Sequence, residues 1–459
     1  MYLEDTIVAP ATAPGRGAVA IVRLSGPRAL AILDALWTPA RPGALRPREL
    51  RLGDIRDPQT GATLDRALAV ATRAPRTFTG EDVAELHCHG GVYIVRRVVA
   101  AAVDSGARIA EPGEFTRRAF LNGRIDLTEA EAIADLVAAR SEGALRQALD
   151  HLAGALALRV KRLRAAVIAV RAHLEAEIDF SDEDIGLPSR ERVAAEIERI
   201  RADVAELHAS FARGRVVREG ARAAIIGRPN AGKSSVLNLL LGVERAIVTP
   251  VPGTTRDVIE DSVAIGPWTI VLEDTAGLRD GGGQVERIGI ERTLSHAAAA
   301  DLLIVVFDAS RPLDDDDHRT IALARGRAGV ALLNKSDLAP VLAPADLFSA
   351  GLAIPALSFS ALCGEGLGAL REELERALAA FAGEGAGTTA AISRERHRIA
   401  LAEALDALET ARAGALASMP PEIVAVDVAR ASSALGAITG EIATEDVLDV
   451  IFRDFCIGK

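Results

Sequence analysis

The residues of this chain best suited to chemistry form a phosphate-binding loop, Gly227-Arg-Pro-Asn-Ala-Gly232-Lys233-Ser234. Its glycines let backbone N–H groups converge on phosphate oxygens, and a helix beginning near Lys233 adds partial positive charge. We expect Lys233 to reach the outer phosphates and the Ser234 hydroxyl to bind Mg²⁺, a hard cation that prefers oxygen ligands. The residues expected to contact nucleotide here are Asn230, Ala231, Gly232, Lys233, Ser234 and Ser235.

Two later segments suit recognition of a guanine base. In Asn334-Lys335-Ser336-Asp337, the Asp337 carboxylate can accept hydrogen bonds from the guanine N1–H and 2-amino group, which adenine does not offer in that register. Because an unpaired buried carboxylate is costly, Asp337 predicts selection of GTP over ATP. Ser360-Ala361-Leu362 follows where such proteins close over the base.

Two more segments are predicted to respond to the γ-phosphate. In Asp274-Thr275-Ala276-Gly277, Asp274 would support Mg²⁺ through water and the Gly277 N–H would sense the phosphate. The other segment is residues 249–257, in which Thr255 would supply a second hydroxyl to Mg²⁺. Its expected nucleotide contacts are Thr249, Pro250, Val251, Pro252, Gly253, Thr254 and Thr255. All these segments occur in order within about one domain's length, which favours a nucleotide site over a plain glycine turn.

The position after Gly277 differs from that of many small GTPases, because Leu278 stands where a water-orienting glutamine is common. A leucine cannot position a nucleophilic water, so another group must. Glu286 lies in the first turn of an expected helix over 285–292, where the helix dipole alone would also favour an acidic residue.

Lysine usage supports these assignments. Only four of the 53 basic residues are lysine, namely Lys161, Lys233, Lys335 and Lys459. Where arginine has replaced lysine elsewhere, a remaining lysine marks a site that needs a compact ammonium group. Two of the four lie in the nucleotide motifs, and the last is the final residue.

Composition limits the class of protein. The chain of 459 residues is long enough for two or three domains, and its three cysteines indicate a reducing, cytoplasmic setting. The acidic N-terminus Met1-Tyr-Leu-Glu-Asp5 and the lack of an apolar run of about 18 residues predict that the chain has neither a signal peptide nor a membrane span. A net charge of −11 argues against a protein that coats nucleic acid. RNA contact would need a local patch, and the basic runs at 159–164 and 394–398 are equally well explained as solvated helix faces.

Hydrophobic patterns predict three zones. Residues 1–120 alternate strands (Ala18–Val22, Leu68–Val70, Val83–His89) with a helix from Val92, whereas 121–218 are helical. A predicted GTPase domain over 219–380 then separates helical residues 121–218 from helical residues 381–459. The predicted fold is multidomain α/β plus all-α, with a helical domain interrupted by an inserted Ras-like P-loop domain and both helical parts packed together.

One N-terminal strand has a polar face. Val83, Glu85, His87 and His89 share it, while Ala84, Leu86 and Cys88 point to the other face. A carboxylate such as Glu85 is a natural partner for the amino-pyrimidine edge of a pterin. A polar strand face without a ligand explains the same pattern, and a zinc site at Glu85, His87 and His89 would lack a supporting Cys or His motif.

The chain resembles the tRNA-modification GTPases of the MnmE (TrmE) family over essentially its whole length. Besides the GTPase motifs, the likeness includes Gly113-Glu-Phe-Thr-Arg-Arg-Ala-Phe-Leu-Asn-Gly123 and the terminal Phe455-Cys-Ile-Gly-Lys459. It implies that Asn230, Thr249, Val251 and Thr254 bind K⁺, that Glu286 helps to orient the attacking water, and that GTPase domains of a homodimer associate.

The resemblance also implies an N-terminal folate-binding and dimerisation domain. Arg23, Glu85, Arg124 and Lys459 match the folate contacts of the family, with Arg124 where a relative can carry lysine. The ligand would be a 5-formyl or 5,10-methylene tetrahydrofolate. Cys456 is a candidate catalytic residue, because it could reach a one-carbon unit or the uridine ring.

The resemblance therefore implies a K⁺-dependent GTPase that uses a tetrahydrofolate one-carbon unit. With a flavin-dependent partner of the MnmG/GidA family, it would form the 5-carboxymethylaminomethyl group on the wobble uridine of certain tRNAs. A ribosome-assembly GTPase of the Era/Der kind is an alternative, although nothing in the chain resembles the RNA-binding domain of those proteins. The second alternative is a nucleotide-gated scaffold that has no catalytic role in modification.

Overall fold

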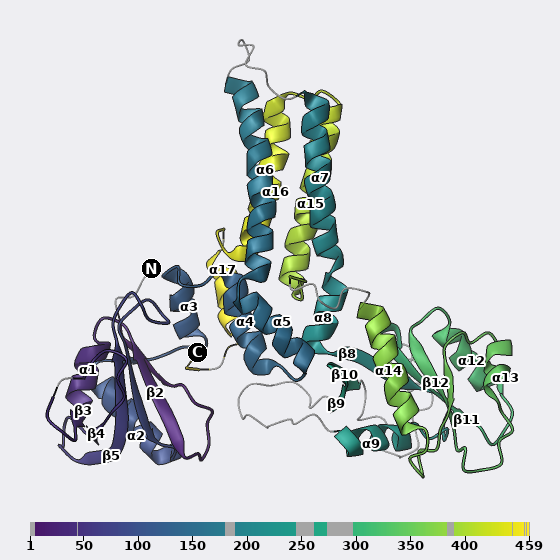
Figure 1. Cartoon of the computed structure of the whole chain (residues 1–459), viewed down its shortest axis with the longest axis horizontal. Coiled ribbons are helices and arrows are strands. Elements are labelled where there is room, and N and C mark those ends of the chain that lie inside the picture. The colour runs from purple at the N-terminus through teal and green to yellow at the C-terminus, as the bar shows by residue number, and fades with distance from the viewer. Residues whose placement is uncertain are drawn as a thin grey trace. The chain divides into compact units, whose positions relative to one another are not determined.

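The computed structural model describes residues 5–43, 45–179, 189–244, 261–272, 297–382, 390–442, 444–453, 455 and 457–458. These residues form two compact units (Figure 1). The first, called here the N-terminal unit, contains the described residues up to Ala134 and those from Thr439 onward, and the second contains the described residues between Asp135 and Ile438. Within the described residues, no helix is both long and apolar enough to cross a membrane.

The N-terminal unit is built on a seven-stranded sheet of order β3-β4-β5-β6-β2-β1-β7. The strands are β1 (Ile7–Pro10), β2 (Val19–Ser25), β3 (Trp37–Pro39), β4 (Arg51–Arg56), β5 (Thr63–Thr72), β6 (Val83–His89) and β7 (Arg108–Ile109). Helices α1 (Ala29–Leu36) and α2 (Val92–Asp104) share one buried core with the sheet. The helix α3 (Glu114–Leu121) places Phe115 in a separate cluster with two residues of β1.

Burial alternates along the central strands, as the period of two requires. In β6, Ala84, Leu86 and Cys88 are buried in the core with α1 and α2, whereas Glu85 and His87 lie half-buried on the opposite, open face. The strand and its two faces confirm the predicted pattern.

The C-terminal segment belongs to the N-terminal unit. The buried residues Leu448 and Phe452 of α17 (Glu445–Arg453), together with Phe455, share a cluster with Leu127 of α4 (Leu127–Ala138). Ile457 then pairs with Pro112 in an isolated antiparallel bridge. Segments more than 300 residues apart in sequence therefore form one local core.

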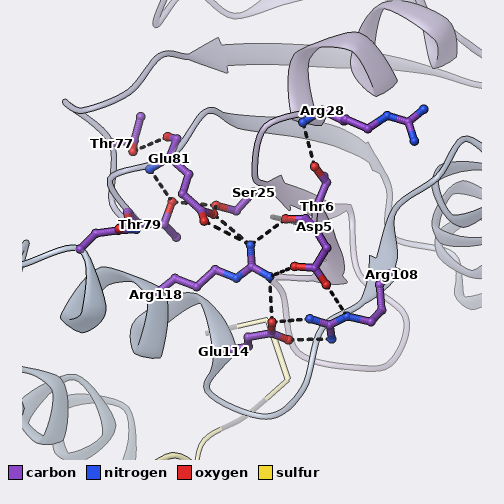
Figure 2. A network of polar contacts seen from close by, with 11 residues as sticks. Asp5, Thr6, Ser25, Arg28, Thr77, Thr79, Glu81, Arg108, Glu114 and Arg118 are labelled. Atoms are coloured by element: carbon purple, nitrogen blue, oxygen red, sulfur yellow. Dashed lines mark hydrogen bonds and ion pairs between the residues drawn. The ribbon is translucent and has the colours of Figure 1, made fainter. Parts of the chain in front are cut away.

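A buried ion network connects α3 to the loops around it, and Figure 2 shows Arg118 at its centre. The Arg118 guanidinium donates to Asp5 Oδ1 at 2.5 Å, Glu114 Oε1 at 3.0 Å and Glu81 Oε1 at 3.2 Å. Arg108 shares two of these carboxylates, since it also pairs with Asp5 and Glu114 at 2.7 and 2.6 Å. Burial would raise the pKa of Glu114, but its hydrogen bonds with both arginines hold that pKa below its usual value.

Four long helices of the second unit pack together, α6 (Ala155–Asp179), α7 (Arg190–Ala209), α15 (Glu395–Leu416) and α16 (Pro421–Thr439) (Figure 1). Their common core combines residues from both sides of the inserted domain, such as Ile197 and Leu401. This confirms that the two helical parts pack together. The helix α7 ends at Ala209, and α8 (Phe211–Glu219) begins after Ser210. The unit also contains the shorter helix α5 (Glu142–Leu152).

The inserted domain has a six-stranded sheet of order β13-β12-β11-β8-β10-β9, in which only the β9–β10 pair is antiparallel. Its strands are β8 (Ala221–Ile226), β9 (Asp261–Ile265), β10 (Trp268–Leu272), β11 (Leu302–Asp308), β12 (Gly329–Asn334) and β13 (Ala356–Ser358). Its helices include α9 (Lys233–Glu244), α12 (Asp315–Ala324), α13 (Pro344–Ser349) and α14 (Leu367–Ala382). The nucleotide motifs therefore follow the carboxyl ends of parallel strands, the usual ligand edge of such sheets.

Candidate functional site

The phosphate-binding loop lies between β8 and α9, as its sequence predicts. Lys233 is the first residue of α9, and its Nζ donates to the carbonyl oxygens of Gly227 and Arg228 at 2.9 and 2.8 Å. Burial lowers the pKa of Lys233. The ammonium group is thus held inside the loop, where a phosphate would offset its desolvation.

The glycine before this lysine is required by its surroundings. Gly232 has a φ of +101°, and a Cβ built on it would lie 2.0 Å from Asn334 Nδ2. A side chain here would push the predicted phosphate-binding loop away from the predicted guanine-binding segment.

Asn334 connects these two loops and the base-closing loop. Its Nδ2 donates to the Ala231 carbonyl at 2.8 Å, and its Oδ1 accepts from the Ala361 N–H at 2.9 Å. The side chain is almost fully buried. The structure therefore gives Asn334 a positioning role between the phosphate and base segments.

The predicted base reader is oriented by a serine. Ser360 Oγ donates to Asp337 Oδ1 at 2.6 Å, and the Cys363 N–H donates to the same Oγ at 3.2 Å. Each carboxylate oxygen has two lone pairs, so this bond leaves both oxygens able to accept from guanine. The structure thus brings Asp337 and Ser360 together, although they are far apart in sequence.

Asp308 is a residue of this site that sequence reasoning missed. It ends β11 opposite Asn334 of β12, and its Oδ2 pairs with Lys335 Nζ at 2.6 Å. Burial would raise the pKa of Asp308, but bonds from Lys335 and Ser310 hold it below its usual value. An acidic residue closing an entirely apolar strand was the available signal.

Several predicted residues lie outside the described residues. They are Thr249, Pro250, Val251, Pro252, Gly253, Thr254, Thr255, Asp274, Thr275, Ala276, Gly277, Glu286, Cys456 and Lys459. Of the predicted metal ligands, the structure describes Ser234 in the first turn of α9 and Asn230, whose φ is +62°. A serine hydroxyl at that turn fits a hard cation, and an asparagine offers a carbonyl oxygen.

A second polar site lies on the open sheet face of the N-terminal unit. Arg23 Nε donates to Glu85 Oε1 at 2.8 Å, and His87 Nε2 lies 3.1 Å from the other oxygen, Glu85 Oε2. Arg23 also lies 5.8 Å from the centroid of the Phe115 ring, which sequence reasoning missed although Phe115 belongs to the 113–123 motif. Burial would raise the pKa of Glu85, but Arg23 and then His87 hold it below its usual value, so the carboxylate is ionised at neutral pH.

Two other predicted residues, Arg124 and His89, contact residues other than Glu85. The Arg124 side chain packs beside Gly80 in the turn after α3. His89 Nδ1 lies 2.8 Å from Asp65 Oδ1, so it is paired away from Glu85 and His87. Within the described residues, no group of three His, Cys, Asp or Glu side chains could hold a metal ion.

The C-terminal segment approaches this face. A Cβ built on Gly458 would lie 1.9 Å from the Pro10 carbonyl oxygen, so the two backbones are in close contact. Pro10 pairs with Val22 in β2, and the adjacent Ala9 pairs with Arg23. Gly458, the residue before Lys459, therefore contacts β1, the strand next to the one that carries the predicted folate contact Arg23.

The two basic runs are partly engaged in intramolecular contacts. Arg159 pairs with Glu206 at 2.9 Å and Arg394 pairs with Asp135 at 2.6 Å. Arg396 donates to the carbonyl oxygens of residues 437 and 438 at 2.6 and 3.0 Å. These contacts connect helices, a structural role that needs no RNA.

Comparison with known proteins covers the whole chain. Residues 6–124 match the family model for the N-terminus of the GTP-binding protein TrmE, and residues 127–456 match that for the MnmE helical domain. The tRNA modification GTPase MnmE of Natranaerobius thermophilus is 40% identical over 99% of this chain and 100% of its own length. Proteins of the same name from Syntrophus aciditrophicus and Roseiflexus sp. are 42% and 44% identical, each over 100% of both chains.

A solved structure matches part of the chain only loosely. The G domain of the FeoB iron transporter of T. maritima is 24% identical over 35% of this chain and 99% of that domain, with a TM-score of 0.26. The full-length relatives and the two family models are decisive. The chain belongs to the MnmE (TrmE) family of tRNA modification GTPases.

Proposed function

We propose that this protein hydrolyses GTP and, with a flavin-dependent partner of the MnmG/GidA family, forms the 5-carboxymethylaminomethyl group at position 34 of certain tRNAs. The observation that carries the proposal is that one family-matched chain holds both an Asp337 carboxylate oriented by Ser360 and an ionised Glu85 on an open sheet face. The Asp337 carboxylate is suited to bind guanine, and the Glu85 carboxylate is suited to bind a pterin. Membership of the family favours this function over ribosome assembly.

In the GTPase site, Lys233 would bind the outer phosphates and Ser234 would hold Mg²⁺ together with Thr255. Asn230, with Thr249, Val251 and Thr254, would hold K⁺. A bound K⁺ supplies fixed positive charge beside the phosphates. Glu286 is proposed to orient the attacking water, in a homodimer whose GTPase domains associate.

In the folate site, the Glu85 carboxylate would accept two hydrogen bonds from the amino-pyrimidine edge of a tetrahydrofolate. The fit rests on its ionised state and on its place on the open face beside Arg23. Arg124 and Lys459 would complete the contacts. The folate supplies the one-carbon unit, and Cys456 is proposed to act at that unit or at the uridine ring.

We also propose the domain boundaries 1–120, 121–218, 219–380 and 381–459, and a cytoplasmic location. The described residues from Thr439 onward belong to the N-terminal unit, so the proposed segment 381–459 is divided between the two units.

Deleting this protein is expected to remove the 5-carboxymethylaminomethyl group from wobble uridine, as measured by mass spectrometry of tRNA nucleosides. Re-expressing the chain should restore the group, whereas Cys456→Ser should not, although its GTP turnover should match that of the unchanged chain. Unaltered nucleosides in the deletion strain would contradict the proposal. Restoration by Cys456→Ser would remove only the role of that cysteine.

GTP turnover is expected to be faster in KCl than in NaCl at equal ionic strength. The reason is that K⁺ replaces an arginine finger, a charge worth roughly 10³-fold or more in related enzymes. Asn230→Ala should lower the rate in KCl towards that in NaCl. Equal rates of the unchanged chain in the two salts would rule out the K⁺ site.

A further inference from the structure

An open cavity of about 800 Å³ lies where β2 begins and β6 ends in the N-terminal unit. Its lining includes Arg16, His89, Tyr93 and Arg96 and contains no carboxylate. The cavity therefore has a cationic lining in a chain whose net charge is −11.

The two arginines differ from many others among the described residues. Within the described residues, neither Arg16 nor Arg96 forms an ion pair, and both are exposed. The neighbouring Arg97, by contrast, pairs with Asp57 at 2.7 Å. Arg16 and Arg96 are thus available to an anionic ligand. The α2 helix begins at Val92 without a side-chain cap, so its N-terminus adds a small partial positive charge to that of the two arginines.

The histidine at the cavity is held by its own partner. Asp65 Oδ2 accepts from the His89 backbone N–H at 2.8 Å, and Asp65 Oδ1 lies 2.8 Å from His89 Nδ1. With Nδ1 engaged, Nε2 is the ring nitrogen left for a ligand.

The cavity and the Arg23–Glu85 pair lie along the same two strands. Arg23 pairs with Glu85 in the β2–β6 ladder, and Val19 pairs with His89 at its end. The rise of an antiparallel strand places these two pairs about 14 Å apart. Both residue pairs lie on the open face, because side chains two and four residues apart point the same way. Tyr93 and Arg96 belong to α2, which packs on the other face, so the cavity lies at the end of the two strands.

The surface between the pair and the cavity combines the half-buried His87 with exposed apolar side chains. Val19 is 58% exposed, and Leu68 of β5, opposite His87 in the ladder, is 37% exposed. A ring that crosses from Glu85 to His89 would cover apolar surface that is otherwise open to water.

We propose that this cavity binds the γ-linked oligoglutamate tail of the folate whose pterin ring Glu85 holds. The inference rests on the proposed folate-binding function. With the pterin at Glu85, the aminobenzoyl group lies over Val19 and Leu68, and the glutamate carboxylates reach Arg16 and Arg96. The preferred ligand is a polyglutamylated tetrahydrofolate, since each added glutamate brings another carboxylate to a cationic cavity.

The test compares 5-formyltetrahydrofolate carrying one and three glutamates, titrated calorimetrically into the full-length protein. We expect the triglutamate to bind roughly tenfold more tightly, the effect of two partly exposed ion pairs. The double variant Arg16→Ala/Arg96→Ala should lose this preference, whereas Arg97→Ala, which removes an adjacent but paired arginine, should keep it. Equal thermal unfolding midpoints would show that the variants fold.

The outcomes separate the inference from the function on which it rests. Equal affinity of the unchanged protein for both ligands would overturn the tail site but leave folate binding intact. Failure to bind either ligand would overturn folate binding itself. If the double variant keeps the triglutamate preference but binds tRNA less tightly, the cavity contacts RNA phosphates and the inference is wrong.

Discussion

Replacing Asp337 by asparagine is expected to lower the kcat/KM for GTP by about 10⁴-fold and to make xanthosine triphosphate the preferred substrate. An asparagine amide can present a donor where the carboxylate presents an acceptor, so the guanine 2-amino group meets another donor. Xanthine carries a carbonyl oxygen at the same ring position and accepts from the amide. Turnover of both nucleotides by the unchanged chain and by the variant measures the effect.

Ser360→Ala is the matched comparison. It removes the 2.6 Å bond that orients Asp337 but leaves the carboxylate in place. We expect a loss of roughly tenfold for GTP, the size of one hydrogen bond to a charged group, without any gain for xanthosine triphosphate. Unchanged discrimination between the two nucleotides in Asp337→Asn would show that another residue reads the base.

Replacing Arg118 by methionine is expected to destabilise the N-terminal unit by about 3–5 kcal/mol, the cost of leaving a buried ion network without one partner. The Arg118 side chain is 7% exposed and contacts three carboxylates, of which Glu81 has no second arginine in the network of Figure 2. Denaturant unfolding followed by Trp37 fluorescence reports this unit. A Trp268→Phe background removes the signal of the chain's other tryptophan.

Arg117→Met is the control at the adjacent position. Arg117 pairs with Glu445 and Asp449, whose side chains are 72% and 63% exposed, so its loss should cost less than about 1 kcal/mol. Equal destabilisation by the two substitutions would contradict the role of the network.

The pH dependence should distinguish a charge effect from lost packing. Burial would raise the pKa of Asp5, and that of Glu114, but their arginine partners hold both below the usual value. A carboxylate with a lowered pKa stabilises the fold fully above its unfolded-state pKa of about 4 and loses that contribution as the pH falls through the lowered value. The difference between the unchanged chain and Arg118→Met should therefore shrink below about pH 4.

Features read from neighbouring residues could be predicted from the sequence. The alternation from Val83 to His89 predicted β6 and its polar face, and the glycine-rich loop predicted the junction of β8 with α9. Strand period and loop chemistry are local properties, which a short window of sequence contains. The joint packing of the two helical parts also followed, because neither part alone has enough faces to close a core.

Contacts between distant segments were decided by the tertiary structure. Arg23 meets Glu85, 62 residues away, because β2 and β6 pair in one register, and a shift of one residue would turn Arg23 into the core. The placement of Phe455 in a cluster with Leu127, and of Asp308 beside Lys335, likewise depends on topology. Sequence spacing specifies which elements form and which side chains share a face, whereas partners across elements depend on register and packing that no local pattern contains.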